Sequence, residues 1–453
     1  MPTDESLLIN DKNDKPLFKL NTANLSSVYA AMQEAHESYD IMDKEATEFL
    51  KTDRQESTLR EISEFEYEVK VESLWRYLRL NYTISRITNF DLHRSSETTP
   101  VYHDFKHRGK PHKIPYKMTA FLTEKQGDNR LVVSFLPFDG KNLDVRFMFD
   151  ATEIKSEELW NDIDNFFYTE GLLKGERFTA KYDFLEMEEY NWDSIIASDA
   201  NRKLMQRNVV DFINHTQVYA EHGVKTSRGL IVCGPPGTGK TLSCKVVMNQ
   251  VDATCIYVAR DSVEDIGDIG RIYKLARKLA PTLVIIEDID TLGGITRLDA
   301  DHPLLGEFLN ALDGVEANEG VITIATTNYS NKLDWAIADR PGRFDIRIDL
   351  GYPDADIRRG IIQQYLESFT TDKINIDSLV KNTDGLSGAY LQEIVRLAFM
   401  KALELVEYDP TKAIIKNDYL VAACGGVLKQ REKTKNELAI YNDDATDDAS
   451  IYG

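Results

Sequence analysis

From residue 229 onward, short apolar runs alternate with longer amphipathic stretches. The apolar runs read GLIVC, TCIYV, LVIIE, VITIAT and IRIDL. Runs of this length separated by helical stretches predict a parallel sheet with helices on both faces. IRIDL alternates in polarity, which is typical of an edge strand. Residues 353–430 predict helices instead, one of which follows Ser387 at an N-cap position.

The first 185 residues follow a different pattern. Apolar side chains recur there at alternating spacings of four and three, along one seam of a predicted helix: Val28, Met32, Ala35, Tyr39, Met42, Ala46 and Phe49. This helix either packs on its own domain or pairs with another chain. Farther along, KMTAFLT, LVVSFLPF and VRFMFDA predict strands, and SEELWNDIDNFFYTEGL predicts a helix. The mixture predicts an α+β accessory domain.

A chain of 453 residues is too long for one ordinary core. We therefore predict an accessory domain over 1–185 that recruits a substrate, and an α/β nucleotide-binding domain over 186–352. A helical lid follows over 353–430. The acidic end, 431–453, is predicted to be a disordered tail.

Composition narrows the class of protein. The hydrophobic share of 42% and the charged share of 28% are those of a soluble globular protein. The net charge of −21 argues against nonspecific nucleic-acid binding by the whole surface. The cysteines form no C-x-x-C pair, the polar N-terminus is no signal peptide, and no apolar run reaches the about 18 residues of a membrane span. We expect a cytoplasmic protein without a membrane span.

One stretch departs from the acidic character of the chain. HDFKHRGKPHKIPYK, residues 103–117, is rich in Lys, Arg, His and Pro. It is either a solvated loop or a docking site for an acidic partner. His103, His107 and His112 are candidate metal ligands, but no cluster of cysteines or carboxylates accompanies them.

The sequence GPPGTGKT lies between an apolar strand and a helix, the context that a phosphate-binding loop requires. Its glycines let backbone N–H groups face the phosphates, and the helix adds its positive end. Lys240 is expected to reach the β- and γ-phosphates of ATP, and the Thr241 hydroxyl to bind Mg²⁺. The expected nucleotide contacts are Gly234, Pro235, Pro236, Gly237, Thr238, Gly239, Lys240, Thr241 and Leu242.

Two acids follow the strand LVII directly. Ligands bind at the carboxyl ends of parallel strands, so these acids should lie near the phosphate loop. Glu287 is expected to hold Mg²⁺ through water, and Asp288 to orient and deprotonate the attacking water. Asn328 ends another apolar strand, and its amide is expected to position that water.

Arg340 and Arg343 flank a Pro-Gly turn in the stretch RPGRFD. Such a turn would hold both guanidinium groups outward on a rigid corner. Arginines that stabilise the charge of phosphoryl transfer are often supplied by a neighbouring subunit.

From Trp192 to about Ala422 the sequence resembles the AAA clade of AAA+ ATPases. NALDGVEANEGVITIATTN and RPGRFD resemble that clade's second region of homology. The resemblance implies a five-stranded parallel sheet of order 5-1-4-3-2 with a helical lid, usually assembled as a homo-hexamer. It also implies residue roles: Asn328 as first sensor, Arg340 and Arg343 as arginine fingers, Asp313 and Gly314 as inter-subunit signalling residues, Gly388 and Ala389 as the lid's nucleotide contact, and Ile195 and Ile196 beside adenine.

Three departures refine this resemblance. The order Glu287-Asp288 replaces the clade's usual Asp-Glu; together with RGLIVCGPPGTGKT and NALDGV it is similar to the mitochondrial cytochrome-complex assembly ATPases and their soluble bacterial relatives. The motif H-E-x-x-H does not occur, so a membrane AAA protease is not expected. The stretch RDSVEDIGDIG lacks the aromatic pore-loop residue of many translocases, which argues against hand-over-hand threading.

The expected function is that of an ATP-hydrolysing ring motor that remodels or moves a protein partner bound through residues 1–185. A slowly cycling nucleotide switch or scaffold is an alternative, which steady-state turnover would distinguish. A nucleic-acid motor is a further alternative; it would require DNA or RNA binding that is sensitive to salt.

Overall fold

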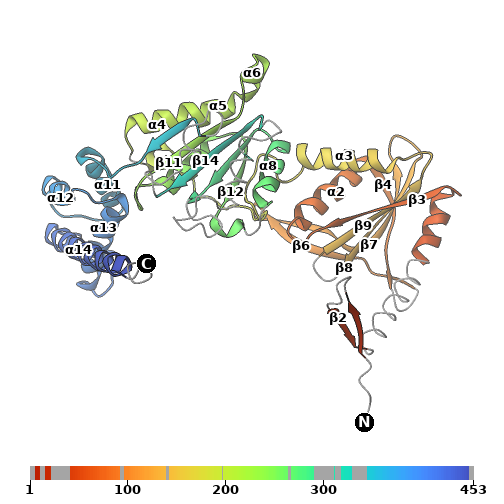
Figure 1. Ribbon diagram of the computed structural model, residues 1–453, viewed down its shortest axis with the longest axis horizontal. Helices are drawn as coiled ribbons and strands as arrows, with labels where there is room; N and C mark the ends of the chain where they lie inside the picture. Colours follow the sequence, from red (N-terminus) through yellow and green to blue (C-terminus); the bar gives the residue numbers. More distant parts are fainter. Residues whose placement is uncertain are drawn as a thin grey trace, which may run out of the picture. The chain divides into compact units, whose positions relative to one another are not determined.

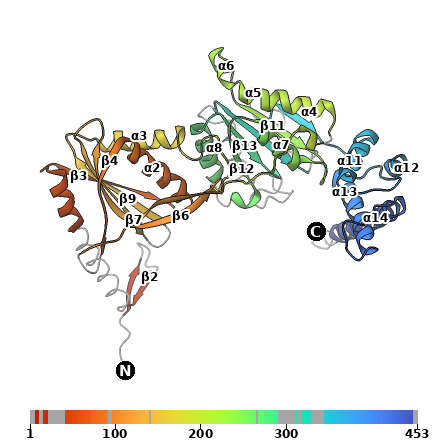
Figure 2. The same ribbon diagram turned by 180° about the vertical axis from the view of Figure 1, so that it is seen from behind.

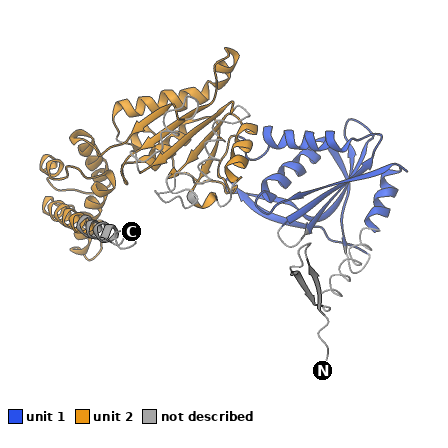
Figure 3. Ribbon diagram, viewed as in Figure 1, with its two compact units in different colours: residues 1–174 blue, residues 175–453 orange. Residues whose placement is uncertain are grey.

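The computed structural model describes residues 6–10, 16–21, 41–91, 96–138, 142–195, 197–263, 267–289, 311, 318–328 and 344–447. The chain forms two compact units, residues 1–174 and 175–453 (Figure 3). This division precedes the predicted boundary at 185/186. The reason is that β10 (Arg177–Thr179) pairs in parallel with β12 (Thr254–Val258), a strand of the second unit.

The first unit is built on a seven-stranded sheet of order β3-β9-β8-β7-β4-β5, in which β6 also pairs with β7. All these pairs are antiparallel. The strands are β3 (Gln55–Ile62), β4 (Tyr82–Asp91), β5 (Ser96–Thr98), β6 (Val101–His107), β7 (Lys110–Glu124), β8 (Arg130–Phe138) and β9 (Asn142–Asp150). A separate hairpin joins β1 (Ser6–Asn10) to β2 (Pro16–Asn21).

Helices cover both faces of this sheet. α2 (Tyr67–Asn81) and α3 (Ser156–Thr169) pack on one face, where they bury Leu131 and Val133 of β8 (Figure 1). The helical residues 41–50 pack on the other face, where Val132 is buried. The period of two along β8 accounts for this alternation, since successive side chains point to opposite faces.

The structure describes only the last part of the predicted N-terminal helical seam. Met42 and Ala46 are buried against the sheet. The rings of Phe49 and Phe121 meet edge-on, with their centroids 5.3 Å apart. This part of the helix therefore packs on its own domain. The earlier seam positions, 28–39, lie outside the described residues.

Two interpretations of the basic segment 103–117 were open, a solvated loop and a docking site. The interpretation as a solvated loop is wrong. It forms most of a hairpin between β6 and β7, whose turn residues Arg108 and Gly109 have φ of 49° and 69°. Phe105 is buried between the exposed Asp104 and Lys106, and Ile114 is buried next to the exposed Lys113, which favours the extended structure.

The second unit contains a six-stranded parallel sheet of order β10-β12-β13-β14-β11-β15. Its remaining strands are β11 (Arg228–Cys233), β13 (Thr282–Ile286), β14 (Val321–Thr327) and β15 (Ile346–Asp349). Counted in chain order from β11, the strands run 5-1-4-3-2, so the predicted AAA+ fold is confirmed. The short β10 is an additional edge strand that the sequence analysis missed.

Helices flank this sheet on both sides (Figures 1 and 2). Residues of α5 (Asp211–Asn214) and α7 (Lys240–Gln250) share a core with alternate residues of the central strands, such as Leu283 and Ile285. α8 (Asp268–Lys278) contacts β12 and β13, and its Tyr273 hydroxyl is hydrogen-bonded to Thr323 at 2.8 Å. The segment between β10 and β11 also forms α4 (Asp199–Met205), a π-helical turn (Gln206–Val210) and α6 (Thr216–Glu221).

The lid consists of α11 (Ala355–Glu367), α12 (Ile376–Asn382), α13 (Gly388–Glu404) and α14 (Asn417–Asp447) around its own apolar core. α14 continues past residue 430, where a disordered tail was predicted. Residues 427–441, VLKQREKTKNELAIY, are rich in strong helix formers, which accounts for the longer helix. Residues 448–453 lie outside the described residues.

Candidate nucleotide-binding site

The predicted phosphate loop connects the end of β11 to the start of α7. Gly237 and Gly239 have φ of 77° and 97°, a region that residues with a Cβ rarely adopt. A Cβ on Gly234 would collide with the carbonyl oxygen of Leu350. All three glycines are therefore required by the backbone path of this loop.

The lid helix α13 starts against this loop. The backbone N–H of Ala389 donates a hydrogen bond of 3.1 Å to the carbonyl oxygen of Gly237. Gly388 lies beside the same carbonyl, so the predicted lid contact adjoins the predicted phosphate loop. Ser387 occupies the N-cap position as predicted, but its hydroxyl makes no capping hydrogen bond and is buried without a partner among the described residues.

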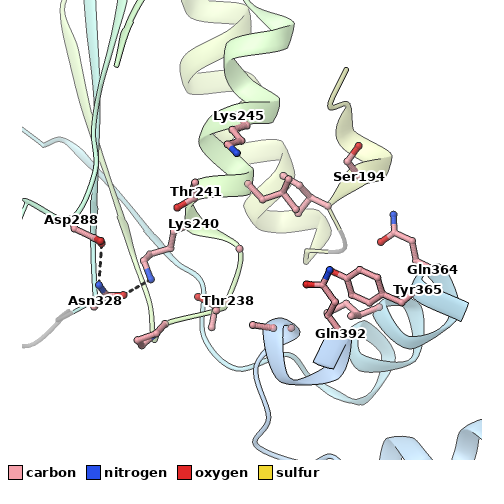
Figure 4. Close-up of a pocket in the computed structure, with 18 residues that line it drawn as sticks. Ser194, Thr238, Lys240, Thr241, Lys245, Asp288, Asn328, Gln364, Tyr365 and Gln392 are labelled. Atoms are coloured by element: carbon pink, nitrogen blue, oxygen red, sulfur yellow. Dashed lines mark hydrogen bonds between the residues drawn. The ribbon is translucent and has the colours of Figure 1, made fainter. Parts of the chain in front are cut away.

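Three side chains, one at the start of α7 and two just after β13 and β14, form a hydrogen-bonded chain beside the loop (Figure 4). Lys240 Nζ donates to Asn328 Oδ1 at 2.8 Å, and Asn328 Nδ2 donates to Asp288 Oδ1 at 3.0 Å. The Lys240 ammonium also donates to the carbonyl oxygens of Gly234 and Pro235, at 2.8 and 3.1 Å. Parallel strands bring these residues together because their carboxyl ends share one edge of the sheet.

The two acids after β13 differ in their surroundings. Asp288 has φ of 46°, and its N–H is held by Thr326 Oγ1 at 3.0 Å. A positive φ in a residue other than glycine is a feature that clusters at functional sites. Glu287 Oε1 is buried and has no hydrogen-bond partner among the described residues. A carboxylate oxygen in this condition fits a cation or its bound water.

Tyr257 of β12 adds to the acidic end of the site. Burial raises the pKa of its hydroxyl, and the hydrogen bond to Glu287 raises it further. The neutral hydroxyl therefore persists beside the carboxylate, where it can only help to orient it. The sequence analysis did not single out Tyr257, because an isolated tyrosine in a strand has no motif.

A cavity of about 520 Å³ opens between the loop and the lid. Figure 4 shows Lys240, Asn328 and Asp288 at one end and Gln364, Tyr365 and Gln392 at the other. The predicted residues that line it are Ile195, Pro236, Gly237, Thr238, Gly239, Lys240, Thr241, Leu242, Asp288, Asn328, Gly388 and Ala389. Gly234, Pro235 and Glu287 do not line it.

Six lining residues were not predicted: Ser194, Lys245, Ile361, Gln364, Tyr365 and Gln392. Ile361, Gln364 and Tyr365 share one face of α11 because they are three and four positions apart. Gln364 Nε2 also donates to the carbonyl oxygen of Asp193 at 2.9 Å, which connects the lid to the segment before Ile195. Helical spacing was visible in the sequence, but the direction in which α11 faces was not.

Five predicted residues lie outside the described residues: Ile196, Asp313, Gly314, Arg340 and Arg343.

The histidines of the basic segment do not form a metal centre. His103 Nε2 is 3.0 Å from Glu68 Oε1, and the rings of His107 and His112 are 5.7 Å apart. Within the part of the chain that the structure describes, no group of three or more His, Cys, Asp or Glu side chains is arranged to hold a metal ion.

Comparison with known proteins finds similarity in the second unit. Residues 230–352 match the model of the ATPase family associated with various cellular activities (AAA). ATP-dependent zinc metalloprotease YME1L1 of Mus musculus is 31% identical over 253 residues, covering 51% of this chain and 35% of that protein. ATP-dependent zinc metalloprotease FtsH of Mycoplasma genitalium is 31% identical over 208 residues, covering 43% and 30%.

A third relative is ATP-dependent zinc metalloprotease FTSH 9, chloroplastic/mitochondrial, of Oryza sativa subsp. japonica. It is 32% identical over 213 residues, covering 45% of this chain and 27% of that protein. The chain thus spans between 27% and 35% of the length of these relatives. The matches support an AAA ATPase domain in the second unit, and with it the hydrolysis of ATP in the presence of Mg²⁺.

The same comparison contradicts the predicted cytoplasmic location. The rice relative is named as a chloroplastic/mitochondrial protein, so an acidic composition without a signal peptide was not a sound basis for that prediction. Among the described residues, no helix combines the length and the apolar character that crossing a bilayer requires.

Proposed function

We propose that this chain is a ring-forming AAA+ motor that uses ATP hydrolysis to remodel or move a protein partner recruited by its first unit. The observation that carries the proposal is the hydrogen-bonded chain from Lys240 through Asn328 to Asp288. It connects a phosphate-binding lysine to a carboxylate at the mouth of a cavity large enough for a nucleotide.

Each residue has a role that follows from its position. Backbone N–H groups of the loop and the N-terminus of α7 hold the phosphates. Lys240 exchanges its contacts with the loop carbonyls for phosphate oxygens. Asp288 accepts the proton of the attacking water, which Asn328 orients through its amide. Ile195, which lines the cavity, lies against the adenine ring, and Ile196 is assigned the same role on the resemblance alone. Gly388 and Ala389 carry the lid toward the phosphates.

The residues present also fit a Mg²⁺ ion. Glu287 Oε1 is a buried carboxylate oxygen without a partner among the described residues, and Thr241 supplies a hydroxyl at the start of α7. Mg²⁺ bound there would neutralise charge on the phosphate oxygens. Hard oxygen ligands of this kind, completed by water, are the usual environment of Mg²⁺.

We further propose a homo-hexamer in which Arg340 and Arg343 reach the phosphates bound by the next subunit. The order Glu287-Asp288 supports a resemblance to the cytochrome-complex assembly ATPases. Because H-E-x-x-H is absent from the 453 residues, we assign no proteolytic step to them. A slowly cycling switch or scaffold remains the second candidate, and the missing aromatic in 260–270 favours it over a threading motor.

The test of assembly mixes two variants that are each inactive. Arg343→Ala removes the cation supplied in trans, which typically costs about 10³–10⁵ in rate, and Lys240→Ala removes phosphate binding. A mixed ring contains interfaces with one intact pocket and one intact arginine, so mixing should restore part of the ATP turnover. No recovery, in mixed rings verified by native mass spectrometry, would reject the arrangement in trans.

The test of partner remodelling uses Asp288→Asn, which should bind ATP without hydrolysing it. A protein retained by this variant and released by the wild-type chain on ATP addition would be the partner. If no retained protein changes the rate at which the wild-type chain hydrolyses ATP, the result would instead support the switch.

A further inference from the structure

The β6–β7 hairpin concentrates positive charge in a chain whose net charge is −21. Between residues 101 and 117 the single acidic residue is Asp104. The basic residues of the same stretch, apart from histidines, are Lys106, Arg108, Lys110, Lys113 and Lys117. The rest of the chain is therefore more acidic than its total suggests, and the hairpin is a local exception to it.

The two faces of the hairpin differ in character. Phe105 pairs with His112 and His103 with Ile114, and the apolar members of these pairs are buried. Lys106 pairs with Pro111 and Asp104 with Lys113 on the opposite face, where both lysines are exposed. The strand period of two thus anchors one face and presents Lys106 and Lys113 on the other. Lys110 pairs with His107 in the register of the anchored face, but it is exposed beside the turn. The exposed basic side chains at this end of the hairpin, Lys106, Arg108, Lys110 and Lys113, are together termed its outer face.

The anchored face is held in place by α2. The Tyr67 hydroxyl donates to the carbonyl oxygen of Pro115 at 2.7 Å, and His103 contacts Glu68 at 3.0 Å. The turn residues Arg108 and Gly109 both have positive φ, as a two-residue turn that matches strand twist requires. The lysines therefore project from a fixed ribbon.

These lysines are not neutralised by their surroundings. Lys106, Lys110 and Lys113 form no ion pair with any residue that the structure describes, although other lysines of this unit, such as Lys70 and Lys155, do. The Lys113 ammonium lies 4.8 Å from the centroid of the Tyr102 ring, which holds it on the outer face. Asp104 is the single acid among these exposed basic side chains, so the face keeps an excess of positive charge that attracts an external anion.

We propose that the outer face of the β6–β7 hairpin binds a short acidic segment, a run of Asp and Glu residues, of the protein partner. This inference rests on the proposed function, which assigns recruitment to the first unit. β6 has 7 residues, so the face is about 23 Å long at about 3.3 Å per residue. An extended acidic segment of similar length matches the whole length of this face.

Nucleic acid fits this face less well. A duplex carries a charge about every 1.7 Å and continues in both directions beyond the hairpin, over a chain that is otherwise strongly acidic. Repulsion by that surface opposes the attraction of the hairpin. A short peptide avoids this repulsion.

The test measures binding of a fluorescein-labelled octaglutamate peptide to the full chain by fluorescence anisotropy. The triple variant Lys106→Glu, Lys110→Glu, Lys113→Glu reverses the charge of the outer face at exposed positions. The matched control, Lys44→Glu, Lys125→Glu, Lys155→Glu, makes the same change in net charge at exposed lysines elsewhere on the first unit. We expect Kd to rise about tenfold or more in the hairpin variant and less than about twofold in the control.

Equal Kd values for the two variants would overturn the proposal. So would tighter, hairpin-dependent binding of an oligothymidylate with the same number of charges, which would make nucleic acid the ligand. A chain lacking residues 441–453 that binds the peptide much more tightly would show that the acidic end of the chain itself occupies the face. ATP turnover of the same samples separates this test from the proposed function, because a failure of turnover leaves the binding comparison readable.

Discussion

Asp288→Asn tests the assignment of the general base with little disturbance of the structure. The Asp288 carboxylate accepts a hydrogen bond of 3.0 Å from Asn328 Nδ2, and an amide oxygen can accept the same bond. Its φ of 46° lies in the left-handed region, which Asn tolerates as well as Asp does. We therefore expect unchanged folding and ATP binding.

The effect on hydrolysis should be large. An amide cannot accept the proton of the attacking water, and a positioned general base contributes about 10²–10⁴ in rate. At about 1.36 kcal/mol for each factor of ten, the barrier should rise by about 3–5 kcal/mol. Phosphate release should fall by that factor while the Kd for ATP, measured by calorimetry, stays within about twofold of wild type.

Two further variants separate chemistry from structure. Asp288→Ala removes the base, the acceptor for Asn328 and the tolerance of positive φ, which costs about 1–2 kcal/mol for the backbone alone. It should therefore lower Tm, whereas Asp288→Asn should not. Asp288→Glu keeps the base on a longer side chain; a site shaped for Asp should turn over more slowly with Glu.

Normal phosphate release by Asp288→Asn would refute this reasoning and would move the base to Glu287 or elsewhere. Loss of ATP binding by the same variant would also refute it, since the hydrogen bond to Asn328 would then be structural. An Asp288→Glu variant that hydrolyses ATP faster than wild type would show that the native residue limits the rate of hydrolysis, which would favour the switch over the motor.

Other predictions follow from single contacts. Lys240→Ala should abolish ATP binding in calorimetry; because the carbonyl oxygens of Gly234 and Pro235 and the amide oxygen of Asn328 lose this donor, it should also reduce the free energy of unfolding by about 1–3 kcal/mol. Gly234→Ala should cost about 1–3 kcal/mol in urea unfolding because its Cβ meets the Leu350 carbonyl, whereas Gly351→Ala, with open space, should change stability by less than about 0.5 kcal/mol. Met42→Ala, at a side chain only 3% exposed, should cost the first unit about 2–5 kcal/mol in the same measurement; an unchanged midpoint would show that the helical residues 41–50 are not part of its core.

The order of the parallel sheet was predictable because its central strands are buried on both faces. Such strands read as continuous apolar runs, and the resemblance supplied their order. β10 was missed because it has 3 residues and only Phe178 of them is buried. For the first unit, the residue pattern predicted strands but not their order in the antiparallel sheet, because pairing between strands that are distant in sequence has no local sequence signal.

The basic hairpin shows how a local signal can mislead. The abundance of Lys, Arg, His and Pro left a solvated loop as one interpretation, and Pro111 and Pro115 cannot donate to a sheet ladder. Residues 110–117 of β7 pair only with β6, however, so one side of this part of the strand has no ladder to complete. Prolines are tolerated there, and the alternation of buried and charged residues decides the structure.

The candidate site likewise contains some residues that a local motif predicts and others that only the tertiary structure brings to it. Motif residues at strand ends could be expected to meet, because a parallel sheet gathers its carboxyl ends at one edge. Gln364, Tyr365 and Gln392 could not be expected, because they reach the cavity only through the packing of α11 and α13 in the lid. Their place depends on a tertiary arrangement that no short pattern encodes.

The site also joins binding to chemistry through shared hydrogen bonds. Lys240 donates to Asn328 and also to the carbonyl oxygens of Gly234 and Pro235. In the proposed function it exchanges those carbonyl oxygens for phosphate oxygens and keeps Asn328, which holds Asp288 with the other end of its amide. A bound phosphate would thus be connected through Asn328 to the carboxylate proposed to act on water. Groups connected in this way do not act additively, so the effects of altering Lys240, Asn328 and Asp288 should not sum. The three side chains are held together because the sheet fixes the spacing of the segments that follow β11, β13 and β14.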